Sequence, residues 1–254
     1  MSALLQVRNV SKRFGGLVAV NDVSFDIQRG NIHALIGPNG AGKTTMFNMI
    51  SALVQPSDGE LLFEEHPLHK TRPDRLAGLG IGRTFQNLAV FGHATVVQNL
   101  LVGMHHRTRT GLLEAGIFFG RARQEEIRAR EKVEEIIEFL EIEDLRDTPV
   151  GALSYGLQKR VELGRALAVG PKLMLLDEMV SGMNGEETED IGRFILDINE
   201  TLDITILMIE HDMHFVMDIS DRVTVLNYGQ LIADGTPAEV SASEAVIKAY
   251  LGRA

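Results

Sequence analysis

Apolar residues along the chain follow two patterns that predict β-strands. Alternating apolar and polar positions are typical of strands with one face in water. Short continuous apolar runs are typical of parallel strands that are covered on both faces. The predicted strands are residues 5–10, 23–27, 32–36, 60–63, 172–176 and 204–209, followed by a hairpin formed by 223–226 and 230–233.

A helical pattern replaces the strand pattern between about residues 98 and 145. Apolar residues recur there at i, i+3, i+4 and i+7, which predicts one buried helix face. Acidic and basic residues between Arg121 and Glu135 fill the other face of this helix, and we interpret that face as solvated. The apolar segment 111–120 is interpreted as the core of a small helical subdomain, with a loop or helix that meets another protein as the alternative. The apolar positions of the buried face are Val133, Ile136, Ile137 and Leu140.

Composition narrows the classes of function. The chain has 254 residues, 44% of them hydrophobic, which is enough for one large domain with a core. Its 35 acidic and 25 basic residues give a net charge of −10, which argues against nonspecific binding of nucleic acid. The absence of cysteine excludes disulfides and thiolate metal sites. No signal-peptide pattern is present and no apolar run approaches the ~18 residues of a membrane span, so we expect any membrane role to act through a partner.

The strongest chemical signal is the segment 37–44, which fits the phosphate-binding pattern G-x-x-x-x-G-K-[ST]. It follows a predicted strand and precedes a helix-compatible run, so glycine amides and the helix start can face an anion. Lys43 would add positive charge at the β- and γ-phosphates, and the Thr44 hydroxyl could ligate Mg²⁺. The alternative is a plain glycine turn that caps a helix. The residues expected to bind nucleotide here are Gly37, Pro38, Asn39, Gly40, Ala41, Gly42, Lys43, Thr44 and Thr45.

Two adjacent carboxylates, Asp177 and Glu178, follow the apolar strand at 172–176. Ligands of a nucleotide-binding sheet lie beyond the carboxyl ends of its strands. We therefore expect Asp177 to face Mg²⁺ and Glu178 to orient or deprotonate a water that attacks the γ-phosphate. The alternative is that these acids merely end a strand. Because the same chain also contains a phosphate loop, this alternative is the weaker interpretation.

A third segment, Leu153–Gln158, places serine and glycine before a helical pattern. Backbone N–H groups and the Ser154 hydroxyl could bind an anion at such a helix start. Taken alone, the segment is better explained as an ordinary capped helix.

Together these segments resemble the nucleotide-binding subunit of ABC (ATP-binding cassette) transporters over essentially the whole chain. The order of the phosphate loop, Gln86, the signature segment, the two carboxylates and His211 matches that family. Within it the chain is most similar to ATPase subunits of branched-chain amino-acid importers of the LivG type. That likeness is carried by GRTFQN (82–87), NLLVGMH (99–105), SGMN (181–184) and AYLG (249–252).

The resemblance implies an α/β fold of the P-loop NTPase class. Its core sheet would be mostly parallel, with an antiparallel β subdomain and a helical subdomain. We expect residues 1–254 to form a single ABC ATP-binding domain, with the helical subdomain at about 87–169 containing the signature segment.

The resemblance also implies roles for residues outside the loop. Gln86 would contact Mg²⁺ or the attacking water and move with the membrane partner, and a polar loop residue is the alternative. His211 would sense the γ-phosphate, holding it or the Glu178 geometry, and a structural histidine is the alternative. Phe14 would stack on adenine unless it packs in the core. Ser154 and Gly156 would close over the γ-phosphate bound by the opposite subunit. The implied catalytic residues are Glu178, His211, Gln86 and Lys43, and the implied Mg²⁺ ligands are Thr44, Gln86 and Asp177.

Five positions depart from the family pattern. In the signature segment, Tyr155 replaces the common glycine and Leu157 stands where glutamine is frequent. Asn184 occupies the usual aspartate position of the following loop. Met179 and Val180 come after the second carboxylate, where proline and a small residue are usual. Losing the proline removes a φ restraint, which bears on the hydrolysis rate rather than on nucleotide binding.

The expected function is that of an ATP-hydrolysing subunit that powers a membrane transporter, with import of branched-chain or hydrophobic amino acids. ATP and Mg²⁺ are the expected cofactors. The expected partners are a second cassette, identical or related, transmembrane permease subunits and, indirectly, a substrate-binding protein, with no nucleic acid. We expect a peripheral location at the cytoplasmic face of a bacterial membrane. The alternatives are an ABC ATPase for lipid or lipopolysaccharide export and a non-transport nucleotide switch. A GTPase is disfavoured because the N/T-K-x-D motif is absent.

Overall fold

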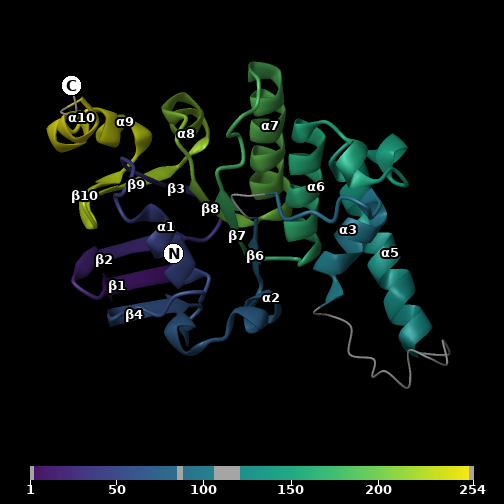
Figure 1. The fold of residues 1–254 in the computed structure, drawn as a ribbon, viewed down its shortest axis with the longest axis horizontal. Helices are drawn as coiled ribbons and strands as arrows, with labels where there is room; N and C mark the ends of the chain where they lie inside the picture. The colour runs from purple at the N-terminus through teal and green to yellow at the C-terminus, as the bar shows by residue number, and fades with distance from the viewer. Residues whose placement is uncertain (1–2, 85–87, 106–120, 252–254) are drawn as a thin grey trace. The chain divides into compact units, whose positions relative to one another are not determined.

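The computed structural model describes residues 3–84, 88–105 and 121–251. The chain divides into two compact units, one formed by residues up to Leu76 together with those from Lys172 onward, and the other by Ala77–Pro171. Figure 1 shows the helices and strands of both units. Gln86 and the apolar segment 111–120 lie outside the described residues, so the predictions made for them stay predictions.

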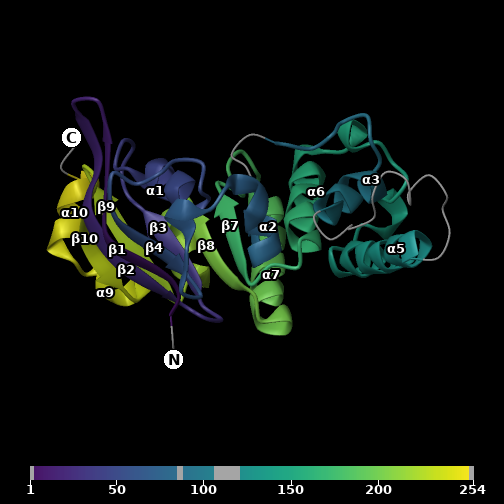
Figure 2. The same ribbon diagram turned by 90° about the horizontal axis from the view of Figure 1, so that it is seen from below.

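An antiparallel sheet forms the N-terminal part of the first unit, with strand order β2-β1-β4-β5. The alternation of buried and exposed residues in β2 matches the pattern that predicted it, because one face of this sheet covers the core. Figure 2 shows β1, β2 and β4 lying side by side. The strands are β1 (Ala3–Phe14), β2 (Leu17–Gln28), β4 (Asp58–Phe63) and β5 (His66–Pro67).

The second sheet of this unit contains the strand order β10-β9-β3-β8-β7. Strands β3, β7, β8 and β9 are parallel, and β9 and β10 form the predicted antiparallel hairpin. Every residue of β3, β7 and β8 is buried, which explains their continuous apolar sequences. The bounds are β3 (Ile32–Ile36), β7 (Leu173–Asp177), β8 (Thr205–Ile209), β9 (Arg222–Asn227) and β10 (Gln230–Gly235).

The helices of the first unit connect or follow the strands of this second sheet. One of them, α1, starts directly after the phosphate loop, and α9 and α10 lie beside the β9–β10 hairpin (Figure 1). The helices are α1 (Lys43–Ile50), α7 (Gly185–Leu202), α8 (Met213–Ile219), α9 (Pro237–Ser241) and α10 (Glu244–Leu251), with 3₁₀ turns η1 (Leu68–Lys70) and η2 (Pro73–Arg75).

The second unit is helical, and its helices α3, α5 and α6 pack against one another. All four apolar positions that predicted a buried helix face are buried. Its elements are β6 (Ile81–Arg83), α3 (Val96–Gly103), α5 (Arg121–Phe139), α6 (Tyr155–Ala168), η4 (Glu143–Leu145) and η5 (Val150–Ala152), preceded by α2 (Leu76–Leu79). Among the described helices, none combines the length and apolarity needed to cross a bilayer. The predicted fold class, a mostly parallel core sheet with an antiparallel β region and a helical region, is confirmed.

Candidate active site

The phosphate loop, residues 37–42, connects β3 to α1 and requires glycine at two positions. Gly37 has φ 149° and Gly42 has φ 101°, conformations that L side chains rarely adopt. A Cβ atom added at Gly37 would lie 2.1 Å from the carbonyl oxygen of Leu226, and one at Gly42 would lie 2.5 Å from that of Ala19. Glycine therefore lets the loop pack tightly against neighbouring backbone.

The turn of the β9–β10 hairpin supports this loop from one side. The N–H of Gly229 donates to the carbonyl oxygen of Ala41 at 3.0 Å, and the N–H of Ala41 donates to that of Pro38 at 3.1 Å. Pro38 and Ala41 are buried, whereas Asn39 and Gly40 at the tip are exposed. The base of the loop is thus fixed while its tip faces solvent.

Helix α1 presents its N-terminus at the end of the loop. Gly42 is the N-cap residue, and within the described chain no side chain caps this end. The first N–H groups of a helix have no intrahelical partner, and together with the helix dipole they favour an anion. Thr44 is exposed and Thr45 is half-buried in this first turn, which leaves both hydroxyls near the helix start.

Lys43 is only 6% exposed and folds back over the loop. Its Nζ atom donates hydrogen bonds to the carbonyl oxygens of Gly37 at 2.6 Å and Pro38 at 3.2 Å. Burial lowers the pKa of Lys43, and the nearby Glu178 carboxylate partly offsets that effect. The loop, the ammonium group and this carboxylate are therefore electrostatically linked within one site.

The two predicted carboxylates lie at the carboxyl end of β7, beside the end of the neighbouring strand β8. Asp177 pairs with Ile209 as the last residues of these parallel strands, and Asp177 is 3% exposed. The N–H of Glu178 donates to the carbonyl oxygen of Ile209 at 2.9 Å, one step beyond the ladder. Glu178 then adopts φ 51°, a left-handed conformation that is uncommon for a non-glycine residue and clusters at functional sites.

Glu178 and His211 follow adjacent strands and meet in space. Their Oε1 and Nε2 atoms are 2.8 Å apart. An ionised carboxylate only accepts hydrogen bonds, so His211 donates from Nε2. The Glu178 side chain is 17% exposed and that of His211 is 45% exposed, so the pair is reachable from solvent. The roles assigned to them in hydrolysis stay predictions.

The buried carboxylate of Glu210 was not predicted from the sequence. It is 3% exposed, and its Oε1 accepts a hydrogen bond from the N–H of Val180 at 3.1 Å. The backbone N–H groups of Met179 and His211 also lie near this carboxylate and favour its ionised form. Burial, together with the Glu178 charge, raises the pKa of Glu210 to about 7. A glutamate directly after an apolar strand and before the site histidine was the signal that could have identified it.

Tyr250 of α10 is a second residue that the sequence analysis did not place in the site. It was noted only as part of the resemblance to one family group. Its phenol lies near the backbone of Gly37, and partial burial raises the pKa of Tyr250 to about 12. The C-terminal helix therefore reaches the first residue of the phosphate loop.

Phe14 lies at the end of β1, near the turn into β2. It is 48% exposed, and the ammonium group of Lys12 lies 5.0 Å from its ring centroid. This exposure argues against the alternative of core packing. Stacking of Phe14 on adenine stays a prediction.

Ser154 and Gly156 belong to the second unit, at the start of α6. Ser154 is the N-cap residue, and its Oγ accepts a hydrogen bond from the N–H of Leu157 at 3.4 Å. Ser154 and Tyr155 are exposed, whereas Gly156 is buried. The capped helix start is therefore present, and its contact with a nucleotide on an opposite subunit stays a prediction.

Asn184 has a local structural role at the position where the family usually has aspartate. Its Oδ1 accepts from the N–H of Glu187 at 3.0 Å, and the Glu187 carboxylate accepts from the N–H of Asn184 at 3.1 Å. This capping box starts α7. Asparagine and aspartate are about equally good N-caps, so the substitution preserves the helix start.

The oxygen donors near the loop are suited to Mg²⁺ bound together with phosphate. Among the described residues, no group of three or more His, Cys, Asp or Glu could hold a metal ion by itself. Mg²⁺ in proteins usually takes one or two side-chain oxygens and completes its shell with phosphate and water. The Thr44 hydroxyl and the Asp177 carboxylate fit that pattern. Gln86, the third predicted ligand, lies outside the described residues.

Comparison with known families and proteins agrees with the site. The model of the family described as "ABC transporter" matches residues 20–181, and "Branched-chain amino acid ATP-binding cassette transporter" matches residues 230–254. The branched-chain amino acid transport ATP-binding protein BraF of Pseudomonas aeruginosa is 39% identical over 252 residues, 99% of this chain and 98% of that protein. The corresponding LivG protein of Escherichia coli K12 is 38% identical, with the same coverage.

Solved structures give the same result. A crystal structure of the ADP conformation of an ATP-binding cassette from an ABC transporter has a TM-score of 0.87 and 33% identity, and the match covers 100% of both chains. A nucleotide-free cassette has a TM-score of 0.85 and 32% identity, and the match covers 98% of this chain and 99% of the other. The chain therefore belongs to the ABC transporter family, as an ATP-binding protein of the LivG/BraF branched-chain amino acid type.

Proposed function

We propose that this chain hydrolyses ATP to power import of branched-chain amino acids. The observation that carries the proposal is the convergence of a phosphate loop, a buried lysine and the Glu178–His211 pair at the carboxyl ends of neighbouring strands. The amino-acid substrate is supported by the names of relatives that match over nearly the full chain. These matches favour amino-acid import over lipid export or a nucleotide switch.

In the proposed reaction, the amides of the phosphate loop and the Lys43 ammonium bind the β- and γ-phosphates. The Thr44 hydroxyl and Asp177 would hold Mg²⁺, which would supply positive charge to neutralise the phosphate oxygens. Glu178 accepts the proton of the attacking water, and His211 keeps that carboxylate oriented through its Nε2–H donor. Catalysis then comes from positioning and charge stabilisation rather than from covalent chemistry.

The proposal includes a second cassette, identical or related, as the partner that completes the site. Ser154 and Gly156 of one subunit cover the γ-phosphate bound by the other, so closure of the pair couples hydrolysis to movement. Permease subunits hold the cassettes at the cytoplasmic face of the membrane, a substrate-binding protein delivers the amino acid, and no nucleic acid takes part.

The test is reconstitution of the chain with its co-purifying permease in liposomes that enclose ATP, so that only transporters whose cassettes face the lumen are supplied with nucleotide. Binding protein and labelled leucine are added outside, and a transporter carrying Glu178→Gln is the matched control. The proposal predicts leucine uptake that requires Mg²⁺ and ATP, is poorly supported by GTP and is lost in the control. Lipid movement without leucine uptake would contradict the assigned substrate, and the absence of ATP hydrolysis would contradict the whole proposal.

A further inference from the structure

Glu210 lies between the end of β8 and His211 in the chain, and its carboxylate contacts the turn after Glu178 through the N–H of Val180. Its carboxylate is buried, yet the proposed mechanism gives it no part. Burying a carboxylate is unfavourable unless its oxygens are hydrogen-bonded, so its partners indicate what it stabilises.

Those partners come from two different loops. The N–H of Val180, which donates to the carboxylate at 3.1 Å, belongs to the turn after Glu178, and the N–H of His211, which lies near it, belongs to the loop after β8. One carboxylate thus connects the main chain beside both members of the Glu178–His211 pair. The two side chains are themselves joined by the 2.8 Å hydrogen bond, so backbone and side-chain contacts restrain the same geometry.

We propose that Glu210 is a positioning residue for ATP hydrolysis, whose carboxylate fixes the backbone on both sides of the Glu178–His211 pair. This inference rests on the proposed roles of Glu178 and His211. It goes beyond them by assigning a function to a buried group that does not reach the reacting atoms.

The sequence around Glu178 explains why such a restraint is useful. Glu178 has φ 51°, which is strained for a residue with a side chain. A proline after it would restrict the following φ but would lack an N–H group. Met179 keeps that N–H, and the N–H of Val180, one residue later in the same turn, donates to Glu210 at 3.1 Å. In this chain a hydrogen bond therefore restrains the turn that proline would otherwise stiffen.

Charge determines how strongly the restraint acts. An ionised carboxylate accepts shorter and stronger hydrogen bonds than a neutral carboxyl group. The groups that act on Glu210 are Glu178, at the end of β7, whose charge favours protonation of Glu210, and the backbone donors, which favour ionisation. With the pKa of Glu210 raised to about 7, the restraint strengthens as pH rises through neutrality.

The experiment compares wild-type chain with Glu210→Gln, which keeps one acceptor oxygen but removes the charge. We expect the kcat for Mg-ATP hydrolysis to fall roughly ten- to a hundred-fold at pH 8, because small displacements of catalytic groups can cost up to about a hundred-fold. KM and the calorimetric Kd for ATP should change less than about two-fold, since the phosphate loop is intact.

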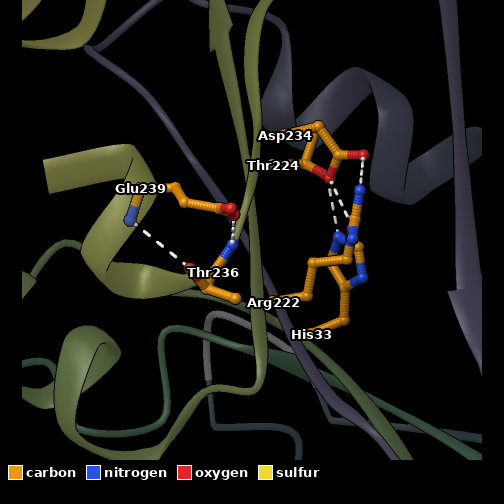
Figure 3. Close-up of polar contacts among 6 residues, drawn as sticks. All are labelled: His33, Arg222, Thr224, Asp234, Thr236 and Glu239. Carbon is orange, nitrogen blue, oxygen red and sulfur yellow. Dashed lines mark hydrogen bonds and ion pairs between the residues drawn. The ribbon is translucent and has the colours of Figure 1, made fainter. Parts of the chain in front are cut away.

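The matched control is Asp234→Asn. Asp234 binds the Arg222 guanidinium at 2.7 and 3.0 Å, in a cluster at the N-terminal ends of β3 and β9, away from the phosphate loop (Figure 3). This substitution also neutralises a partly buried carboxylate of the same sheet. We expect Asp234→Asn to leave kcat within about two-fold of wild type. A similar fall of kcat in both variants would instead indicate a general loss of sheet rigidity.

A pH series separates positioning from a merely structural role. His211 is present in wild type and in Glu210→Gln, so the ratio of their kcat values cancels its contribution. The ratio should be close to one at pH 6, where Glu210 is mostly protonated, and should rise through about pH 7 to a plateau. A ratio that stays constant between pH 6 and pH 8.5 would overturn the charge-dependent restraint.

Measuring Glu178→Gln in the same assay distinguishes failure of the positioning role of Glu210 from failure of the proposed function. If Glu178→Gln loses turnover while Glu210→Gln keeps the wild-type kcat, the positioning role is wrong and the proposed function stands. If Glu178→Gln itself turns over like wild type, the assignment of the catalytic base fails first. Thermal unfolding at pH 8 should show Glu210→Gln at least as stable as wild type, because the substitution removes a buried charge.

Discussion

The Nε2 atom of His211 donates a 2.8 Å hydrogen bond to Oε1 of Glu178. The two residues are 33 positions apart in sequence, and they meet because β7 and β8 are parallel neighbours that end in register at Asp177 and Ile209. A histidine that holds a carboxylate in this way fixes one oxygen and leaves the other able to accept a proton from water. The geometry of the proposed catalytic pair is thus set by strand pairing.

Replacing Glu178 by glutamine should abolish turnover while leaving nucleotide binding intact. The amide cannot accept a proton from water, so we expect hydrolysis to fall by roughly 10²–10⁴-fold. The variant should also accumulate as an ATP-bound dimer, which size-exclusion chromatography with Mg-ATP would detect beside a phosphate-release assay.

Glu187→Gln is the control for that substitution, because glutamine preserves the capping box with Asn184. It should retain wild-type turnover. If Glu178→Gln hydrolysed ATP as fast as this control, Glu178 would not be the base.

His33 should make the protein less stable in mild acid. Its ring is fully buried, Nε2 lies 2.8 Å from Thr224 Oγ1, and that hydroxyl donates to Asp234 (Figure 3). Among the described residues Nδ1 has no hydrogen-bond partner, so protonation there would bury an unpaired N–H. Burial lowers the pKa of His33 to about 4, against the opposing effect of the Asp234 charge.

Because the pKa of His33 is lower in the folded state than in the unfolded chain, the unfolded chain binds the proton first as pH falls. Stability linked to His33 is therefore lost between pH 6.5 and 4, by about 2 kcal/mol from pH 7 to pH 5. Urea denaturation of wild type and His33→Gln at both pH values measures this difference. Equal pH dependence in the two proteins would contradict the assignment.

Glu210 should have the opposite effect on stability. Its pKa in the folded state, about 7, lies above the ordinary glutamate value, so the folded chain binds the proton first. Stability linked to Glu210 is fully present below about pH 4.5 and declines as pH rises to 7. Glu210→Gln should remove about 2 kcal/mol of this dependence between pH 5 and pH 7. The same urea series tests it, and a variant with the wild-type slope would show that Glu210 titrates normally.

Helix α6 contains a fully buried ion pair between Lys159 and Glu162. Their Nζ and Oε2 atoms are 3.3 Å apart, and both side chains are 0% exposed. Lys159→Met would leave the glutamate charge buried without this partner, so we expect a loss of about 3–5 kcal/mol of stability. Adding Glu162→Leu should recover most of that loss. Equal unfolding free energies for the single and double variants would show that the pair is not coupled.

Much of the fold could be predicted from sequence because the buried strands are continuous apolar runs. The run at 32–36 gives the bounds of β3 directly. Strand β1 extends well beyond its predicted end at Val10, because the exposed residues near the β1–β2 turn carry no alternating apolar signal. The helix face around Val133 was predictable because its 3.6-residue period is strong.

The site was predictable only where a local pattern carries the chemistry. The loop at Lys43 and the acids at Asp177 and Glu178 are contiguous motifs beside clear strands. The burial of Lys159 and Glu162 could not be predicted, because the sequence pattern of α6 gives no sign that this charged pair faces the interior. The position of Glu210 after an apolar strand was visible in the sequence, but its burial was not, because it depends on a backbone donor from a distant loop.

The central claim is that a triphosphate binds to the loop amides and the Lys43 ammonium. Isothermal calorimetry of Mg-ATP binding to wild type, Lys43→Ala and Lys172→Ala tests it most directly. Lys172 is the control because it is a half-exposed lysine that pairs with Glu64 at 2.7 Å. We predict Mg²⁺-dependent binding that Lys43→Ala weakens at least about tenfold and Lys172→Ala leaves unchanged. Undetectable binding to wild type, or equal affinity in wild type and Lys43→Ala, would contradict the account.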